Sequence, residues 1–174
     1  MLIFFGEIRT PSYVQINFMK IILFQPQIPQ NTGNIVRTCA VTGSSLVLVR
    51  PLGFSVTDRW LKRAGLDYWE GVDVSFIDDL DEFLQKTTDQ FYFFSSKAST
   101  KYSDLRYNAD DILIFGSETS GLPAHFHQKW QERFATVPMK PKARCLNLAT
   151  TVGIVTYEAC RQQQWQSFRE ITPT

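Results

Sequence analysis

The chain has 174 residues, of which 44% are hydrophobic and 20% are charged, and its formal net charge is +1. These values fit one globular domain with a hydrophobic core, and they exclude an intrinsically disordered chain and a protein with an overall basic excess. No apolar run reaches the roughly 18 residues that a membrane helix needs, so no membrane partner is expected.

The first eighteen residues show no sustained period. We expect either that Met19 is the natural start or that 1–18 is a loosely held extension to a single domain that spans 19–174. An extra edge strand over 2–5 is the alternative. The first clear strand is predicted over 20–25, directly after Met19.

Strands and helices are predicted to alternate through the rest of the chain. The pattern predicts helices over 31–42, 58–64, 78–86 and 147–165, a short helix after Pro123, and strands over 46–49, 74–77, 91–94, 112–115 and 134–137. This order is typical of an α/β domain with a mostly parallel sheet and helices on both faces. Because open α/β sheets bind ligands beyond the carboxyl ends of their strands, the loops after Gln25, Phe94, Phe115 and Val137 are the expected site.

In the first of these loops, residues 28–37 read IPQNTGNIVR. Asn31 and Arg37 are six residues apart, which is not quite two helical turns. Their side chains reach the same end of a site only if the helix begins after Asn31. A capping loop followed by a solvated arginine explains the same residues, and the segment alone does not separate the two interpretations.

A second loop, 115–123, reads FGSETSGLP, and its glycines allow the backbone to approach a ligand closely. It is not a phosphate-binding P-loop, because no Gly-Lys-Ser/Thr follows, and the glycine order of a dinucleotide fingerprint is absent. Glu118 at the strand end is predicted to be either a helix cap or a polar ligand contact.

Cations gather in a few short segments. Lys140, Lys142 and Arg144 lie between the last strand and the last helix, for which Asn147 is a good N-cap residue. Four further cations are expected to extend an RNA-binding face. Three of them, Arg59, Lys62 and Arg63, lie on one face of the predicted helix over 58–64, and the fourth is Arg50. Arg161 on the last helix is a further candidate RNA contact. A solvated helix face is the alternative, whereas phosphate contacts predict binding that falls steeply with salt.

The three cysteines, Cys39, Cys145 and Cys160, have no paired spacing. Their odd number argues against a disulfide framework and favours reduced thiols in a cytoplasmic protein. The two histidines are not accompanied by a Cys-x-x-Cys pair, so no metal site is expected.

Four segments together resemble the SPOUT superfamily of RNA methyltransferases and, more narrowly, the TrmL group, which 2′-O-methylates the wobble nucleotide of certain tRNAs. The resemblance runs from about residue 19 to about residue 162. It is carried by 26–43 (PQIPQNTGNIVRTCAVTG), 51–54 (PLGF) with 65–70 (GLDYWE), 115–123 (FGSETSGLP) and 146–162 (LNLATTVGIVTYEACRQ).

The resemblance implies a parallel sheet that ends in a deep trefoil knot, and a homodimer whose site is completed across the interface. It also implies methyl transfer from S-adenosylmethionine to the ribose 2′-hydroxyl of cytidine or uridine at position 34 of tRNA, with S-adenosylhomocysteine as the product.

Residues that match the functional positions of the family follow from the same resemblance. The implied catalytic residues are Asn31, Arg37, Glu118 and Asn147. The implied cofactor contacts are Phe94, Ser95, Gly116, Glu118, Val137, Pro138, Met139, Cys145 and Leu146. Position 145 is commonly serine in this motif. The thiol found here is a weak hydrogen-bond donor, so backbone contacts matter more than the side chain at that position.

Arg37 is the candidate catalytic residue of the family, but a guanidinium stays protonated in proteins. Our hypothesis is that Arg37 orients a substrate phosphate and stabilises developing alkoxide charge, while a phosphate or water accepts the proton. Rival interpretations are methylation of another tRNA site or of rRNA, and an RNA-binding module without catalysis. A nucleotide hydrolase is disfavoured, because no activated nucleophile motif is present.

Overall fold

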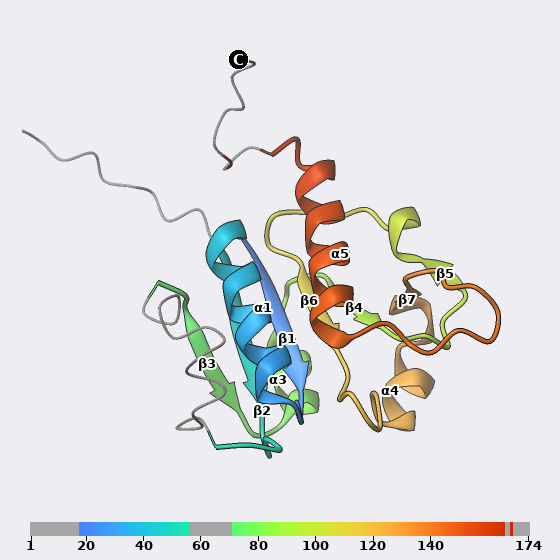
Figure 1. Cartoon of the computed structure of the whole chain (residues 1–174), viewed down its shortest axis with the longest axis horizontal. Coiled ribbons are helices and arrows are strands. Elements are labelled where there is room, and N and C mark those ends of the chain that lie inside the picture. The colour runs from blue at the N-terminus through green and yellow to red at the C-terminus, as the bar shows by residue number, and fades with distance from the viewer. Residues whose placement is uncertain (1–17, 56–70, 166–167, 169–174) are drawn as a thin grey trace, which may run out of the picture.

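Seven parallel strands form the centre of the molecule. The computed structural model describes residues 18–55, 71–165 and 168. Its strands are β1 (Phe18–Phe24), β2 (Ser44–Val49), β3 (Val74–Ile77), β4 (Phe91–Phe94), β5 (Thr100–Lys101), β6 (Ile112–Phe115) and β7 (Phe134–Thr136). They pair in the order β3-β2-β1-β6-β4-β7-β5, and every pair is parallel (Figure 1).

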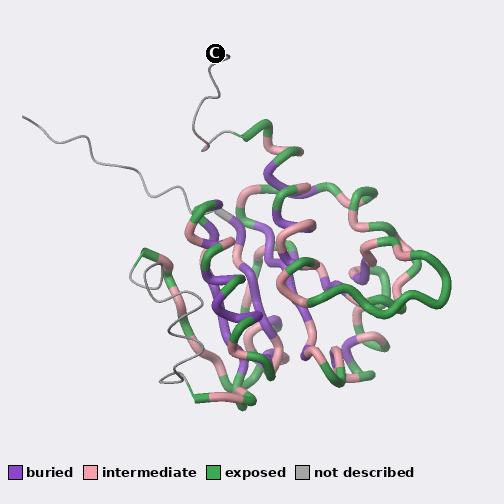
Figure 2. Tube along the Cα trace, in the orientation of Figure 1, coloured by how far each residue is buried: buried purple, intermediate pink, exposed green. Residues whose placement is uncertain are grey.

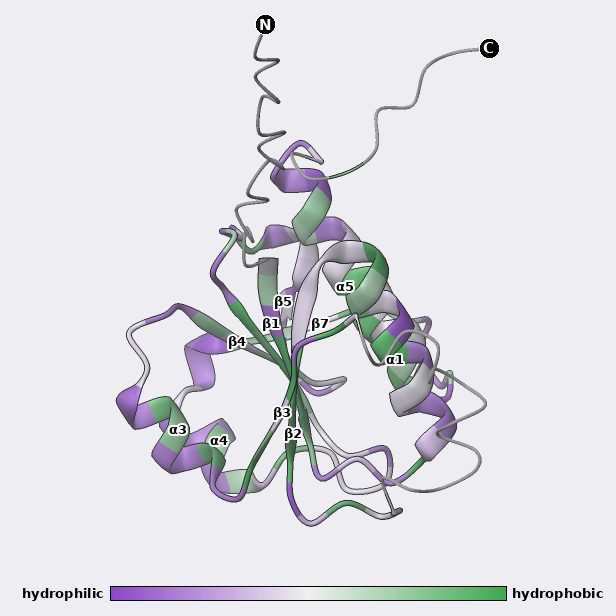
Figure 3. Cartoon of the chain, turned by 90° about the vertical axis from the view of Figure 1, so that its left-hand side faces the viewer, coloured by the Kyte–Doolittle hydropathy of each residue, from purple (hydrophilic) through white to green (hydrophobic). Residues whose placement is uncertain are grey.

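Helices cover both faces of this sheet, which confirms the predicted α/β architecture. The α-helices are α1 (Pro29–Thr42), α3 (Leu80–Lys86), α4 (Ala124–Lys129) and α5 (Leu148–Gln162), and the 3-10 turns are η1 (Tyr102–Asp104) and η2 (Gln131–Arg133). With the sheet seen along its edge, α1 and α5 lie on one side and α3 and α4 on the other (Figure 3). No helix among the described residues is long and apolar enough to cross a bilayer.

Two hydrophobic clusters, one on each face of the sheet, explain why the central strands are apolar throughout. In β1, Ile21 and Leu23 pack in the cluster beneath α1 and α5, whereas Ile22 packs in the cluster beneath α3 and α4. Successive side chains of a strand point to opposite faces, so a strand covered on both sides alternates between the two clusters. The buried strands and the inner side of α1 are visible in Figure 2.

The three cysteines are free, as their spacing predicts. Cys39 and Cys160 are buried, and burial raises the pKa of the Cys39 thiol to about 12 and that of Cys160 to about 11. Cys145 is the exposed member of the three. These two buried cysteines belong to the core. Their thiols are poor nucleophiles, because a thiol with so high a pKa is rarely deprotonated.

Several helix ends differ from the prediction for local reasons. Helix α1 begins at Pro29 rather than at residue 31, because proline has no N–H to lose and suits the first helical turn. Helix α5 ends at Gln162 rather than at residue 165, where Gln164 and Trp165 both take a φ of 57°. Asp79 caps α3 by accepting a hydrogen bond from Glu82 N at 3.0 Å, so α3 begins at Leu80 rather than at residue 78.

Short elements of two or three residues, β5, η1 and η2, were not predicted, because such segments carry too little periodicity. The predicted helix over 58–64 and the alternative strand over 2–5 lie outside the described residues.

The order of the strands reverses at the middle of the sheet. From β1 the chain builds outward through β2 to β3. The four later strands all lie on the other side of β1, where β6 is its direct neighbour. Ligands of open α/β sheets bind beyond the carboxyl ends of the strands at such a switch point. The carboxyl ends of β1, β6, β4 and β7 therefore mark where a site is expected.

Candidate functional site

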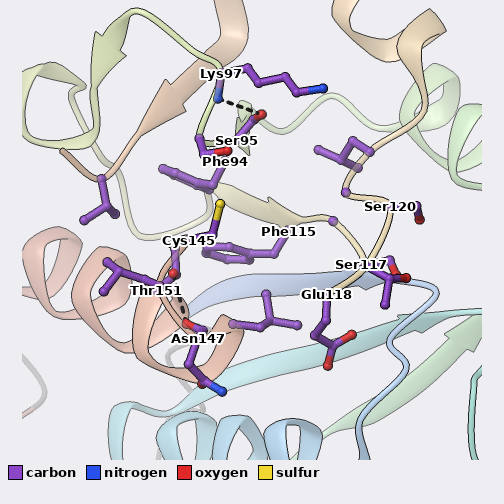
Figure 4. Close-up of a pocket in the computed structure, with 18 of the residues that line it drawn as sticks. Phe94, Ser95, Lys97, Phe115, Ser117, Glu118, Ser120, Cys145, Asn147 and Thr151 are labelled. Atoms are coloured by element: carbon purple, nitrogen blue, oxygen red, sulfur yellow. Dashed lines mark hydrogen bonds between the residues drawn. The ribbon is translucent and has the colours of Figure 1, made fainter. Parts of the chain in front are cut away.

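A cavity of about 520 Å³ lies beyond these carboxyl ends (Figure 4). Its walls come from the loops after β1, β4, β6 and β7 and from the start of α5, so all four loops singled out in the sequence meet there. A cavity of this size suits a small organic ligand or cofactor. The rings of Phe94 and Phe115 stack 4.8 Å apart in its wall, and Figure 4 shows Cys145 next to them.

Most of the predicted cofactor contacts lie in the cavity wall. They are Phe94, Ser95, Gly116, Glu118, Val137, Met139, Cys145 and Leu146. Pro138 does not belong to the wall, although both of its neighbours do. Hence the structure brings these residues together from four separate segments.

The loop after β6 is a tight turn that depends on two glycines. Ser117 and Gly121 exchange backbone hydrogen bonds of 3.2 and 2.9 Å across its neck. A Cβ atom on Gly116 would lie 2.4 Å from the carbonyl carbon of Gly121, and Gly121 itself has a φ of 68°, which favours glycine. These glycines therefore close the loop on itself, and Glu118 projects from the closed loop.

Glu118 is the centre of a hydrogen-bonded network that joins three segments. Its carboxylate accepts hydrogen bonds from Gln27 N (2.8 Å), Ile28 N (3.2 Å) and Asn31 Nδ2 (2.9 Å). Asn31 Oδ1 in turn accepts one from Asn147 Nδ2 at 2.8 Å. Three of the four predicted catalytic residues are thus in direct contact and line the same end of the cavity.

The direction of this network is fixed at both ends. A carboxylate only accepts, so Asn31 turns its NH₂ group toward Glu118. The first backbone amides of α5 only donate, so Asn147 turns its oxygen toward Ala149 N (2.9 Å) and Thr150 N (3.3 Å). Each asparagine has therefore one possible orientation, and both fit the bond between them.

Arg37 does not join this network. Because α1 begins at Pro29, Asn31 and Arg37 are both helical, and six helical residues separate them by about 240° around the axis and about 9 Å along it. Asn31 is 5% exposed and faces the cavity, whereas Arg37 is exposed and is not part of the cavity wall. The two side chains would reach the same end of the site only if the helix began after Asn31, and it begins at Pro29 instead.

The opposite end of the cavity carries the predicted Ser95 together with Lys97 and His127, which sequence reasoning did not assign to the cavity. Lys97 and Ser95 lie at this end in Figure 4, where Lys97 N donates to Ser95 Oγ at 3.3 Å. His127 of α4 also lines the cavity. Burial lowers the pKa of His127, and the positive charge of Lys97 lowers it further. Lys97 follows β4 directly, but no sequence signal connects His127 to the site.

The predicted RNA contacts that the structure describes lie outside the cavity wall and are exposed. Lys140, Lys142 and Arg144 belong to the exposed loop that leads into α5, which stands out in Figure 2. The other two already have acidic partners, since Arg50 contacts Asp78 at 3.2 Å and Arg161 forms a two-point contact with Glu158 at 2.8 Å. Residues Arg59, Lys62 and Arg63 lie outside the described part of the chain.

Within the described ranges, no three His, Cys, Asp or Glu side chains gather in a way that would hold a metal ion.

Residues 19–157 match the SpoU rRNA Methylase family. A Listeria monocytogenes protein whose name specifies a tRNA (cytidine(34)-2′-O)-methyltransferase is 50% identical over 149 residues, which cover 83% of this chain and 88% of that protein. A Yersinia pestis protein named tRNA (cytidine(34)-2′-O)-methyltransferase is 40% identical over 151 residues, covering 83% and 93%.

Solved structures agree with this match. A Bacillus anthracis protein superposes with a TM-score of 0.81 at 42% identity, covering 87% of this chain and 98% of that one. A structure described as concerning 2-OH methylation of C/U34 on tRNA has a TM-score of 0.77 at 40% identity, covering 87% and 99%. The SpoU methyltransferase AviRb from Streptomyces viridochromogenes, solved in complex with AdoMet, shares the fold with a TM-score of 0.75 at 21% identity, covering 88% and 60%.

Proposed function

Because this chain belongs to the SpoU rRNA Methylase family, we propose that it transfers a methyl group from S-adenosylmethionine to the 2′-hydroxyl of cytidine or uridine 34 of tRNA. The proposed substrate rests on one observation, which is the 50% identity over most of the chain to a protein named for this reaction. We also propose that the enzyme acts in the cytoplasm, because tRNA is its proposed substrate.

The cavity fits the cofactor. S-adenosylmethionine combines an apolar, flat adenine with polar ribose and amino-acid ends, and the cavity combines stacked Phe94 and Phe115 with polar groups at both ends. We propose that Val137 and Met139 line the adenine side and that the backbone of loop 116–121 holds the amino-acid side. When bound, the cofactor supplies a methyl group on a sulfonium, which is a good leaving group.

The role of Arg37 in this proposal is to position and stabilise. Its guanidinium stays protonated, so it orients a phosphate of the substrate and stabilises negative charge that develops on the ribose oxygen. The proton of the 2′-hydroxyl passes to a phosphate or to water. Holding the ribose oxygen in line with the methyl carbon supplies much of the remaining rate enhancement.

We propose that two copies form a dimer and that Arg37 of one copy completes the cavity of the other. Support comes from the position of Arg37, which is exposed on α1 and lies outside the cavity of its own chain. Large apolar side chains are also exposed on α1 and α5, where Val41 is 53% and Tyr157 43% exposed. Exposed apolar groups of this kind mark interaction surfaces when they gather in a patch.

We propose that the exposed loop over 140–147 meets the RNA backbone. It places Lys140, Lys142 and Arg144 next to the cavity, since Cys145 and Leu146 of the same loop line the wall. Cations in such a loop hold phosphates without reading sequence. Arg50 and Arg161 are weaker candidates, because carboxylates already neutralise them.

We further propose that residues 19–174 form one domain whose C-terminal part is knotted. Strands β4 and β5 follow each other in the chain, yet β7, from much later in the sequence, is paired between them. The segment over 95–99 therefore crosses the end of β7. Such a crossing is one part of the arrangement that the proposed threading requires.

Methyl transfer to unmodified tRNA tests the proposed function. The purified chain is incubated with labelled S-adenosylmethionine and tRNA that lacks the modification, and the nucleosides are identified by mass spectrometry. We expect a 2′-O-methylated nucleotide 34, and we expect the rate to fall by at least about a hundredfold in Arg37→Ala, as for loss of a group that stabilises transition-state charge.

Each rival interpretation gives a different result in this experiment. Label at another tRNA nucleotide, or in rRNA, would keep the reaction and overturn the substrate. An RNA-binding module without catalysis would bind tRNA but would show neither transfer nor cofactor binding by calorimetry.

A further inference from the structure

The N-terminus of α1 lacks a cap from its own sequence. Its N-cap position is Ile28, whose side chain cannot accept a hydrogen bond, and its first turn contains no acidic residue. The first amides of a helix have no partner within the helix and carry partial positive charge, so a nearby anion stabilises them. Local sequence therefore leaves this helix end without the group that it needs.

Glu118, about 90 positions further along the chain, provides an acceptor for the backbone amide of the N-cap residue Ile28, the donor that the acidic residue of a capping box satisfies from within a helix. It accepts from the backbone amides of Gln27 and Ile28 and from the side chain of Asn31 in the first turn. All three partners are donors, so the carboxylate form suits the position and an amide does not. The same residue belongs to the closed loop 116–121, which forms one wall of the cavity.

Segment 26–28 is also held from its other side. Gly53 of the PLGF segment donates its backbone N–H to Pro26 O at 2.9 Å, and a Cβ atom on Gly53 would lie 2.8 Å from Gln27 Cα. This close approach fixes the entry to α1 between the PLGF segment and Glu118.

We infer that Glu118 is a positioning residue, which caps α1 from the cofactor-side loop and so sets the place of the helix that carries Asn31 and Arg37. The inference rests on the proposed function and changes the role expected for Glu118, because the residue acts through α1 rather than on the reacting atoms. Loop 116–121 and the start of α1 then behave as one rigid unit.

Glu118→Gln tests the cap. Glutamine keeps the size of the side chain but turns an NH₂ group toward at least one donor, so we expect hydrogen exchange of the Gln27 and Ile28 amides to quicken by about tenfold or more. We also expect kcat to fall by about tenfold or more, while the dissociation constant of S-adenosylmethionine changes by less than about threefold.

Rescue by a local cap separates positioning from chemistry. Ile28→Asp places an N-cap acceptor at a residue with the extended backbone that a cap requires, φ −111° and ψ 109°. An aspartate at position 28 accepts from the amides of Gln30 and Asn31. In the Glu118→Gln background we therefore expect Ile28→Asp to slow the exchange of these first-turn amides and to restore most of the lost kcat, relative to the Ile28→Asp single variant. Ile28→Ala in the same background is the matched control, since it removes the isoleucine without providing a cap.

Two results would overturn the inference: unchanged amide exchange in Glu118→Gln, or first-turn exchange slowed by Asp at position 28 while kcat stays low. A wild-type chain that transfers no methyl group to any RNA overturns the proposed function alone. The exchange measurement then still decides whether Glu118 caps α1.

Discussion

A single buried carboxyl group, Asp111, shows how one side chain shapes stability. It is 2% exposed and accepts a hydrogen bond from Asn108 N at 2.9 Å just before β6. Burial raises the pKa of Asp111 above its ordinary value, and the hydrogen bond offsets this only in part. The folded state therefore holds the proton at pH values where the unfolded chain has lost it.

The sign of the pH dependence follows from this shift. A group with a raised pKa in the folded state contributes most to stability below its unfolded pKa, and this contribution is lost as the pH rises through the folded pKa. Asp111→Asn cannot titrate, so we expect it to lose stability relative to wild type at pH 4 and to recover toward or above wild type at pH 7. Urea unfolding at both pH values measures the difference.

Asp110→Asn is the matched control, because Asp110 is the exposed neighbour of Asp111. An equal change for the two variants would show that burial is not the cause.

At the scale of elements, Asn147 performs two tasks with the two ends of one amide. Its oxygen caps α5, and its NH₂ group donates to Asn31 and so ties α5 to α1. Two substitutions separate these tasks. Asn147→Asp keeps the cap but presents an oxygen to Asn31 Oδ1, whereas Asn147→Ala removes both.

We expect Asn147→Ala to lower the free energy of unfolding by at least about 1 kcal/mol, the usual cost of a lost N-cap. Asn147→Asp should lose less stability, because an acidic side chain suits a helix N-terminus. Both variants should lose methyl-transfer activity to a similar degree, since both break the link to Asn31. Thermal unfolding and the transfer assay, run on the same preparations, compare the two. If Asn147→Asp keeps full activity, the link between the helices does not matter for the reaction.

At the scale of the whole molecule, the proposed dimer predicts complementation between two inactive chains. Arg37→Ala removes the proposed contribution to the partner's cavity, and Cys145→Trp fills the cavity of its own chain from an exposed position. A mixed dimer contains one cavity that is open and is also served by an intact Arg37.

Random mixing makes about half of all dimers mixed, each with one complete site of two, so we expect about a quarter of wild-type activity. The variants are unfolded together, refolded as a mixture and assayed for methyl transfer. Activity no greater than that of either variant alone would place Arg37 at the cavity of its own chain.

The sequence by itself determined the architecture and the position of the site. Apolar runs such as 112–115 and 46–49 predict strands buried on both faces, and alternation with helices predicts a parallel sheet, because these patterns depend on local periodicity. The carboxyl ends of parallel strands lie at one edge, so the loops that form the cavity followed from the chain order. The segments 26–43 and 115–123 also resemble the SPOUT superfamily in sequence alone.

Only the tertiary structure decided which of these residues meet. The contact of Glu118 with Gln27, Ile28 and Asn31, and the bond from Asn147 to Asn31, span about 90 to 116 positions of sequence, and no local pattern encodes such a distance. The place of Arg37 away from the cavity depended on where α1 begins, and the helix begins at Pro29, which suits a first helical turn. His127 entered the site in the same way, because packing of α4 on the sheet is a property of the folded chain.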